Sequence, residues 1–280
     1  MTPTSKLATI IALNIYPVKS CRGIALSIAR IASTGFEHDR EWLIVQPNGR
    51  FVTQREQPRL ALIRPTLGAD MLTLGVPDLE PLEIPLAHEG SATQVVCWKD
   101  QCAAIDAGDK AAHWLERFLG QPHRLVRFDP SFKRRSDPTW TGDLVAHAQF
   151  SDGFPWLLLS QASLHDLNSR LDTPLPMNRF RPNIVVDGID AYEEDRIGEL
   201  TLGQVAMRPV KPCTRCAITT TDQDSGRRTG EDPLKTLRRY RLDRHLKGVA
   251  FGQNVILRQG VGEWLSVGDA FRIEHRASLG

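Results

Sequence analysis

Two cysteines separated by two residues, Cys213 and Cys216, lie in the stretch "KPCTRCAITTTDQDSG", which spans 211–226. This spacing lets two thiolates reach one zinc ion or form a redox disulfide, and a single thiolate can also bind the metal of a larger cofactor. Two small thiols that only pack in a protein core can have the same spacing. The pair therefore raises four alternatives, and the rest of the sequence has to separate them.

A structural zinc site commonly takes four Cys or His ligands. No cysteine follows Cys216, and His245 and His275 are isolated. Cys97 and Cys102 could join only as a pair with four intervening residues. The sequence therefore supplies no standard second pair of zinc ligands, although it does not exclude a zinc site.

A redox pair works best when its first cysteine begins a helix, because the helix dipole lowers the pKa of the thiol. Cys216 is followed by Ala-Ile-Thr-Thr-Thr, whose β-branched residues predict a strand. Calcium is disfavoured nearby, since Gly226 and Pro233 stand where an EF-hand loop starting at Asp222 needs acids. We expect a hairpin turn at 222–226, and on spacing alone two buried cysteines remain the simplest interpretation.

Most of the chain has the pattern of short strands. β-Branched and apolar runs are punctuated by Gly, Pro, Asn and Asp, and Asn48-Gly49 is a strong signal for a hairpin. The spacing favours an antiparallel barrel or sandwich over alternating strands and helices. The expected strands in the first hundred residues lie within 7–18, 24–31, 41–49, 51–54, 60–67, 70–76 and 92–98.

Three segments predict helices: 109–121, which has one apolar face; 160–172, with Ser160 as N-cap; and 231–241, with Pro233 in its first turn. The Pro-, Ser- and charge-rich stretch 127–143 predicts a loop at a domain boundary. We therefore expect a mainly β chain with a few helices, divided into domains at 1–126 and 127–280.

Composition excludes several classes of function. The 280 residues are 41% hydrophobic, which is typical of a globular protein. The net charge is only +2, so the chain has no strong positive potential that would attract a nucleic-acid polymer. No apolar run is long enough to cross a membrane. Five cysteines, an odd number in a long chain, favour a reducing cytoplasm over a disulfide scaffold.

Five stretches occur together and in order: "YPVKS" (16–20), "DREWLIV" (39–45), "FRPNIVV" (180–186), the cysteine stretch and "FGQN" (251–254). In this combination the chain resembles the MOSC-domain family, which is named after the C-terminal domain of a molybdenum cofactor sulfurase. It is similar to members that also carry a MOSC N-terminal β-barrel domain, such as the mitochondrial amidoxime-reducing component and its bacterial relatives. The resemblance implies two β-barrel-like domains with a molybdopterin cofactor between them.

The resemblance also implies a set of site residues. Cys216 matches the thiolate that binds molybdenum, which makes it the metal and catalytic residue, and Asp152 is a candidate proton donor. Ordered water is an equal alternative for that role. The positions that match cofactor contacts are Lys19, Ser20, Arg40, Ser151, Arg181, Asn183, Thr214 and Arg215. Gly153 replaces a hydroxyl residue that is frequent in relatives, so one contact of that segment is lost.

A family member of this kind is expected to reduce small N-hydroxylated compounds such as amidoximes, hydroxylamines and N-hydroxylated bases. No Rossmann fingerprint occurs, and no iron–sulfur cysteine run follows Cys216, so we expect electrons from a separate ferredoxin-, flavin- or cytochrome-type protein. Residues 208–258 contain 12 Lys or Arg and 5 Asp or Glu, which gives a net charge of +7. This charge could bind an acidic electron-donor protein, and an ordinary solvent-exposed basic surface is the alternative. A cofactor carrier and a persulfide sulfur-transfer protein remain the alternatives.

Overall fold

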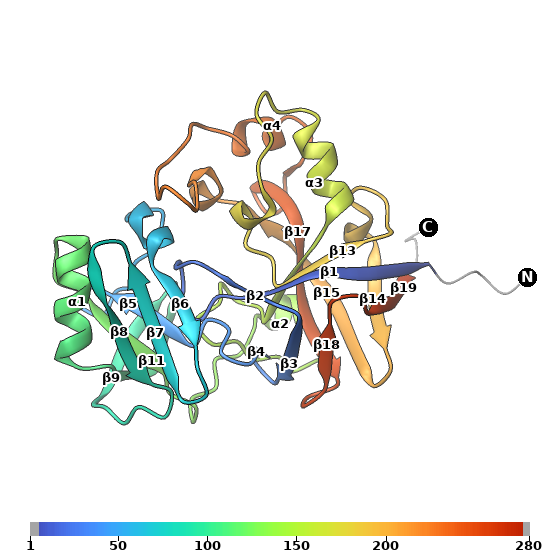
Figure 1. Cartoon of the computed structure of the whole chain (residues 1–280). Coiled ribbons are helices and arrows are strands. Elements are labelled where there is room, and N and C mark those ends of the chain that lie inside the picture. The colour runs from blue at the N-terminus through green and yellow to red at the C-terminus, as the bar shows by residue number, and fades with distance from the viewer. Residues whose placement is uncertain (1–5, 277–280) are drawn as a thin grey trace, which may run out of the picture.

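The largest sheet combines strands from both ends of the chain (Figure 1). The computed structural model describes residues 6–276. Seven strands follow one another in the order β12-β13-β1-β19-β14-β15-β17, and pairing of β12 with β17 closes them into a barrel. Their bounds are Leu7–Ile15 for β1, Trp156–Ser160 for β12, Ile184–Asp187 for β13, Ile197–Leu202 for β14, Val205–Thr214 for β15, Gly248–Gln259 for β17 and Ala270–His275 for β19.

Strand β1 belongs to this barrel although its partners come much later in the chain. Leu13 pairs with Ile184 of β13, and Ala8 pairs with Phe271 of β19. Alternate residues of β1 point into the barrel core, which also holds the buried Trp156. The domain division at 126/127 stays a prediction. Strand β1 precedes that division in the chain but belongs to the barrel that is formed mainly by strands after it.

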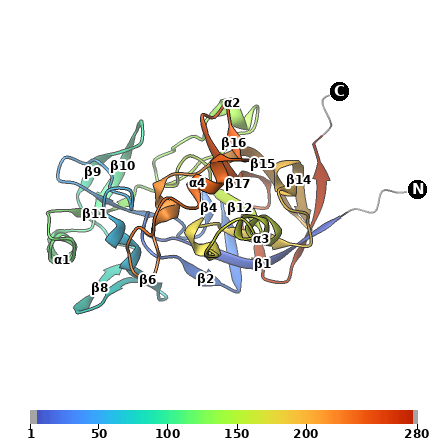
Figure 2. The same cartoon turned by 90° about the horizontal axis from the view of Figure 1, so that it is seen from above.

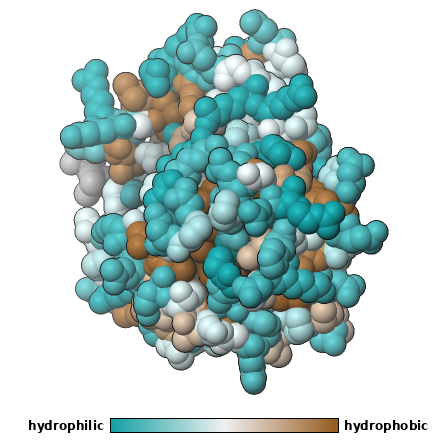
Figure 3. All heavy atoms as spheres, turned by 90° about the vertical axis from the view of Figure 1, so that its left-hand side faces the viewer, coloured by the Kyte–Doolittle hydropathy of each residue, from teal (hydrophilic) through white to brown (hydrophobic). Residues whose placement is uncertain are grey.

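The N-terminal lobe consists of two smaller sheets and helix α1 (Asp109–Leu119). Trp114, Leu115 and Phe118 on one face of α1 pack into the core of this lobe, and the helix ends at Gly120 in the left-handed conformation. Figure 3 shows that the outer face of the lobe is largely hydrophilic. The strands are β5 (Trp42–Val45), β9 (Ala92–Cys97), β10 (Asp100–Asp106) and β11 (Arg124–Phe128) in one sheet, and β6 (Arg64–Leu67), β7 (Met71–Val76) and β8 (Leu79–Pro85) in the other.

Short elements cover the barrel and join it to the N-terminal lobe. Helix α3 (Gln161–Asn168) and helix α4 (Leu234–Arg238) lie at the top of the barrel lobe in Figure 1, and Figure 2 looks down on them. Ser160 caps α3 by accepting a hydrogen bond from the Ser163 backbone, as expected. The remaining elements are β2 (Ile24–Leu26), β3 (Ile28–Ala32), β4 (Gly35–Phe36), β16 (Leu242–Asp243), β18 (Trp264–Ser266) and α2 (Pro138–Thr141). Four 3-10 helices complete the described chain: η1 (Pro58–Leu62), η2 (Met177–Arg179), η3 (Glu193–Asp195) and η4 (Ala217–Thr220).

The expected fold class, mainly β with a few helices, is confirmed. Within residues 6–276, no helix combines the length and the apolar character that crossing a bilayer requires. The hairpin turns expected at Asn48-Gly49 and at 222–226 both form, and Gly49 takes a φ of +80°.

The strand expected after Cys216 is wrong, because 217–220 form the 3-10 helix η4. The hydroxyl of Thr219 donates to the carbonyl of Cys216 at 2.9 Å, and that of Thr220 donates to the carbonyl of Ala217 at 2.8 Å. These side-chain bonds to the preceding turn offset the β propensity of the threonines. Cys216 therefore caps a short helical turn instead of continuing strand β15.

Three smaller expectations in the N-terminal half and the linker also fail. Residues 51–54 form a turn with a single bridge at Phe51, and 60–62 belong to η1, which Pro58 begins with its fixed φ. The loop expected at 127–143 contains the short helix α2, capped by Asp137. At 58–62 the fixed φ of Pro58 outweighs the apolar pattern, and at 138–141 the Asp137 cap starts a helix within the loop.

Closure of the barrel generates a prediction at Gly252. Its φ is +83°, and a Cβ added there would lie 2.8 Å from the carbonyl oxygen of Leu158 on β12. Gly252→Ala is therefore expected to lower the free energy of unfolding by about 3 kcal/mol, because strain and a clash add. Urea unfolding followed by circular dichroism measures it.

Gly262→Ala is the matched control. Gly262 also has a positive φ, +92°, but a Cβ there would meet nothing within 4 Å. It is expected to cost only the backbone strain, about 1 kcal/mol. Equal losses in the two variants would contradict the tight closure of β12 on β17.

Candidate functional site

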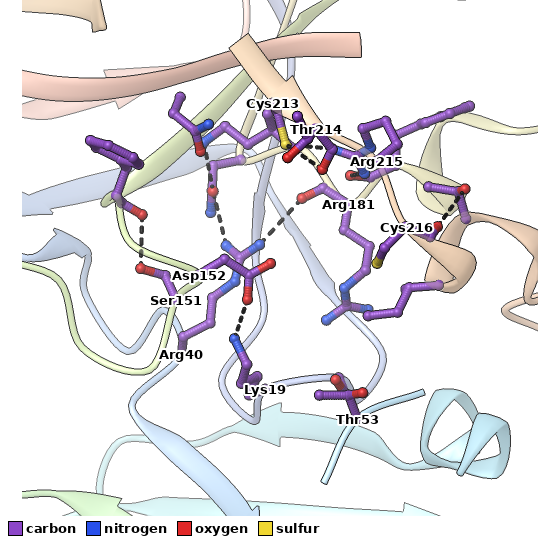
Figure 4. A pocket seen from close by; sticks show the side chains of 18 of the residues that line it. Lys19, Arg40, Thr53, Ser151, Asp152, Arg181, Cys213, Thr214, Arg215 and Cys216 are labelled. Atoms are coloured by element: carbon purple, nitrogen blue, oxygen red, sulfur yellow. Dashed lines mark hydrogen bonds and ion pairs between the residues drawn. The ribbon is translucent and has the colours of Figure 1, made fainter. Parts of the chain in front are cut away.

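One cleft at the junction of the two lobes contains every residue that the sequence resemblance selected (Figure 4). The N-terminal segment between β1 and β5 supplies three of them, and the barrel lobe supplies the others. These residues are Lys19, Ser20, Arg40, Ser151, Asp152, Arg181, Asn183, Thr214, Arg215 and Cys216. The structure thus brings the set together, and the roles of its members stay predictions.

The Tyr16 ring separates two arginines of the cleft. The guanidinium carbons of Arg40 and Arg181 each lie 4.2 Å from the ring centroid. The Tyr16 hydroxyl donates to the carbonyl of Pro182 at 3.1 Å, and burial raises its pKa to about 12, so it keeps its proton. Cations over an aromatic face are attracted by its quadrupole, and the ring therefore holds two positive groups close together.

Arg40 is held by groups from both lobes. Its Nη1 donates to both carboxylate oxygens of Asp39, at 2.8 and 2.6 Å, and to the side-chain oxygen of Asn183 at 2.9 Å. That oxygen also accepts from the Leu157 backbone at 3.1 Å, while the Asn183 amide donates to the carbonyl of Asn14. The Asn183 side chain therefore links the lobes, and most of its hydrogen-bonding capacity is already used.

Arg181 is a buried cation without a counter-charge. Its relative exposure is 9%, and among residues 6–276 its guanidinium has neither an ion pair nor a side-chain hydrogen bond. Burial is the main cause that lowers its pKa to about 10, and the nearby positive charge of Arg40 adds to the effect. The guanidinium is still charged at neutral pH, so the cleft offers an unneutralised positive charge.

Lys19 and Asp152 form an ion pair on another side of the cleft (Figure 4). The Lys19 ammonium donates to Asp152 at 2.5 Å and to the carbonyl of Phe150 at 2.7 Å, which leaves one of its three hydrogens available. Desolvation beside the cleft disfavours the charged form of Asp152, whose side chain is nevertheless 68% exposed, and the charge and hydrogen bond of Lys19 outweigh this effect. The pKa of Asp152 therefore lies well below its ordinary value.

The cysteine segment lies at the end of β15, and the Cys216 thiol is half-buried in the cleft. Arg215 turns back from it, donating to the Cys213 sulfur at 2.9 Å and to the carbonyl of Phe180 at 2.6 Å. Burial raises the pKa of the Cys213 thiol, although the guanidinium of Arg215 opposes this. Both cysteines are half-buried and line the cleft, and the Cys213 sulfur already accepts a hydrogen bond from Arg215.

Several donors of residues that line the cleft have no partner in the described part of the chain. The Ser20 hydroxyl has no hydrogen bond within residues 6–276, and Arg215 Nε is also unpaired but is enclosed by protein. The same region contains no group of three or more His, Cys, Asp or Glu side chains arranged to hold a metal. A metal at Cys216 would therefore take its other ligands from outside the chain, and unpaired donors beside Arg181 fit an anionic organic group.

Sequence analysis gave no role to several other residues of this region, among them Tyr16, Thr53, Trp98 and Phe154. Tyr16 lies in the stretch "YPVKS", but its role depends on two arginines far along the chain. Trp98 lies at the tip of the β9–β10 hairpin, and nothing in its local sequence distinguishes it from a solvent-exposed residue. Only the folded arrangement brings these side chains to the cleft.

Comparison with known proteins finds two families along the chain. Residues 7–122 match the MOSC N-terminal beta barrel domain, and residues 146–272 match the MOSC domain. Human mitochondrial amidoxime-reducing component 1 is 38% identical over 268 residues, covering 90% of this chain and 79% of the relative. The mouse protein of that name is 39% identical over 249 residues (85% and 72%), and bovine mitochondrial amidoxime reducing component 2 is 37% identical over 246 residues (85% and 73%).

The position of Tyr16 between two arginines generates a stability prediction. Tyr16→Phe keeps the ring and loses one buried hydrogen bond, so it is expected to lower the free energy of unfolding by about 1 kcal/mol. Tyr16→Leu also removes both cation–π contacts and should cost about 3 kcal/mol. Equal losses in urea unfolding would show that the ring does not hold the arginines.

Proposed function

This chain belongs to the MOSC-domain family and combines a MOSC N-terminal β-barrel domain with a MOSC domain, and from that premise we propose that it is a molybdenum-cofactor-dependent oxidoreductase. Its substrates would be N-hydroxylated compounds such as amidoximes, hydroxylamines and N-hydroxylated bases. Relatives that carry the words amidoxime-reducing in their names support a reductase of this kind.

The observation that carries the proposal is the combination of two half-buried thiols, Cys213 and Cys216, with an unneutralised guanidinium in the same cleft. The family resemblance selects Cys216 as the metal ligand. A soft thiolate suits molybdenum, and Arg181 suits the phosphate of a molybdopterin. Lys19 can give its remaining hydrogen to the same anion, and the Ser20 hydroxyl is free to join it. The residues present therefore fit the cofactor that the family implies.

The other cleft residues would position these groups. Arg40 and Asn183 fix the backbone around Arg181, since Arg40 Nη2 donates to the Arg181 carbonyl at 3.3 Å. Ser151 donates to the carbonyl of Phe154 at 2.8 Å and so shapes the loop that carries Asp152. Thr214 and Arg215 place Cys216 at the end of β15, where backbone and hydroxyl groups can meet the edge of a pterin.

When bound, the cofactor would supply the two-electron chemistry at the nitrogen–oxygen bond. The overall reaction breaks that bond, uses two protons and two electrons, and yields the amine-type product and water. Asp152 is charged at neutral pH because Lys19 stabilises its carboxylate, so it would deliver a proton only after taking one up. Ordered water therefore remains an equal alternative as the donor.

Two alternatives within the family use the same cysteine without reductase activity. A carrier would bind the cofactor and pass it on, and a sulfur-transfer protein would hold a persulfide on Cys216. The Arg181 guanidinium, which lines the cleft without an ion pair in the described residues, favours a bound anion over a persulfide alone, since a persulfide needs no phosphate site. The cytoplasmic location stays a prediction; the five cysteines are free, while the relatives are named mitochondrial.

Metal analysis followed by a reductase assay tests the proposal. Protein purified from cells that make the cofactor should hold molybdenum and reduce benzamidoxime with a reduced dye as electron source. Cys216→Ala should lose both the metal and the activity, by a factor of about 100 or more, because the only thiolate ligand is gone.

Cys213→Ala serves as the comparison, since it removes the neighbouring thiol and is expected to retain molybdenum. Molybdenum in the wild type without turnover of any N-hydroxylated compound would identify a carrier. Cyanide-labile sulfur on Cys216 without molybdenum would identify the sulfur-transfer alternative.

We further place the electron donor on the basic segment 227–247. Arg227, Arg238, Arg239, Arg244 and Lys247 are all exposed there. Helix α4 of this segment contacts η4, the turn that Cys216 caps, so a donor bound here would lie near the cleft. An acidic surface is the expected complement, whether the donor is of ferredoxin, flavin or cytochrome type.

Charge reversal tests this surface. Arg238→Glu is expected to lower the rate of reduction by an acidic donor protein about tenfold at low salt, and the deficit should shrink as ionic strength rises. Turnover with a small uncharged reductant should not change. Lys110→Glu, an equal charge change on the distant helix α1, should have no effect, and equal effects of the two variants would rule out docking at 227–247.

A further inference from the structure

A second hollow continues outwards from the cleft, and we call it the outer groove. Trp98, Asp152 and Phe154 line both spaces, so the two are continuous. The groove has walls from both halves of the chain: the β9–β10 hairpin on one side, and the segment after β11 together with β15 on the other. A small molecule that reaches Cys216 by this route would pass these three residues.

The N-terminal half contributes an aromatic wall with a cation on it. The rings of Phe51 and Trp98 have centroids 5.3 Å apart, and the guanidinium carbon of Arg55 lies 4.3 Å from the Trp98 ring. Trp98 is held in place, because its indole N–H donates to Asp152 Oδ1 at 3.1 Å. Even so, the Trp98 side chain is 40% exposed and presents open aromatic surface to the groove.

The barrel half contributes Phe154 and Lys211 to the opposite wall. The Lys211 ammonium lies 5.9 Å from the Phe154 ring centroid, and it is backed by the Trp140 ring, 5.0 Å away, which does not itself line the groove. Both walls thus combine flat apolar rings with a positive charge. Aromatic rings stack on such surfaces, and a positive charge beside them attracts an anion carried by the same ligand.

The charge balance of the groove favours an anion. Four carboxylates line it, and three are already in ion pairs: Glu56 with Arg50, Asp100 with Arg134 and Asp152 with Lys19. Four cations that line it have no ion-pair partner within residues 6–276: Arg55, Lys99, Arg135 and Lys211. Only Asp137 remains to oppose them, and its side chain caps α2.

We propose that the outer groove is the substrate-recognition site and that it selects flat aromatic compounds that carry an anionic group such as a carboxylate. This inference rests on the proposed reductase function. The ring would stack on Trp98 and Phe154, and the anion would pair with Lys211, since the Arg55 guanidinium already lies on the Trp98 ring. The N-hydroxylated end of the molecule would then point past Asp152 towards Cys216. A cationic compound of the same shape would be repelled.

Three benzamidoximes that differ only at the para position test this selection: the parent compound, the 4-carboxylate and the 4-trimethylammonium derivative. Isothermal titration calorimetry on the molybdenum-loaded protein gives Kd, and the dye-coupled assay gives KM. The carboxylate should bind roughly tenfold more tightly than the parent, and the ammonium compound roughly tenfold more weakly. Raising the salt concentration should compress both differences.

Variants assign the effect to named residues. Lys211→Gln should abolish most of the preference for the carboxylate and leave binding of the parent compound nearly unchanged. Trp98→Ala should weaken all three compounds about fivefold to tenfold, while Trp98→Phe, which keeps a ring, should recover most of the loss. Circular dichroism and urea unfolding confirm that each variant is folded.

Trp264→Ala is the matched control. Trp264 on β18 is 53% exposed and has Arg30 6.0 Å from its ring, but it does not line the groove, so its loss should change none of the three constants. Equal affinity for the three compounds, or equal effects of Trp98→Ala and Trp264→Ala, would overturn the inference about the groove. Turnover of all three compounds would still support the proposed reductase function in that case. If the three compounds bind in the predicted order of affinity but none is turned over, the inference about the groove holds and the proposed reductase function is refuted.

Discussion

A buried guanidinium without a carboxylate partner is the constraint on which the site depends. Burying an unpaired charge is costly, and a neutral side chain of similar size would remove that cost. Arg181 lies at the seam of the two lobes against the Tyr16 ring, and its guanidinium has no ion pair among the described residues. The fold therefore holds a positive charge ready for an anion that arrives from solution.

Backbone strain is concentrated around the same charge. Ser20, Arg40 and Arg181 have φ values of +67°, +52° and +57°, a region that costs a non-glycine residue of order 1 kcal/mol. Hydrogen bonds offset this strain: Gln54 donates to the carbonyl of Ser20 at 2.7 Å within the N-terminal lobe, and Asn183 accepts from Arg40 across the seam. The arrangement is thus fixed before any ligand binds, which reduces the entropy that binding has to overcome.

Barrel topology explains why both lobes are needed. Strand β1 enters the barrel, and the chain then passes through Tyr16, Lys19 and Ser20 at the seam. It continues through β2, which pairs with β1, and β3, which pairs with β18, before it reaches β5 of the N-terminal lobe. The other side of the cleft comes from β15 and from the segment before β13. A cleft of this kind forms only when residues far apart in the chain meet, so neither lobe contains the site by itself.

The sequence predicted the mainly β class and helix α1, because alternation and capping are local signals. The ten residues that share one cleft were selected because the motifs of the chain resemble those of a known family. The spacing of Cys213 and Cys216 alone favoured two buried thiols. Tyr16 and Trp98 could not be predicted, since their roles depend on partners that only the tertiary fold brings close. The turn at 217–220 was missed because threonine hydroxyls bonded to the backbone outweighed β propensity.

A crystal structure of the protein purified from cells that make the cofactor, with anomalous data collected at the molybdenum edge, tests the central claim most directly. The account predicts an anomalous peak bonded to the Cys216 sulfur, and an organic phosphate in contact with Arg181 and Lys19. A metal bound elsewhere, or a cleft in which Cys216 is joined to Cys213 by a disulfide and Arg181 contacts only solvent, would contradict it.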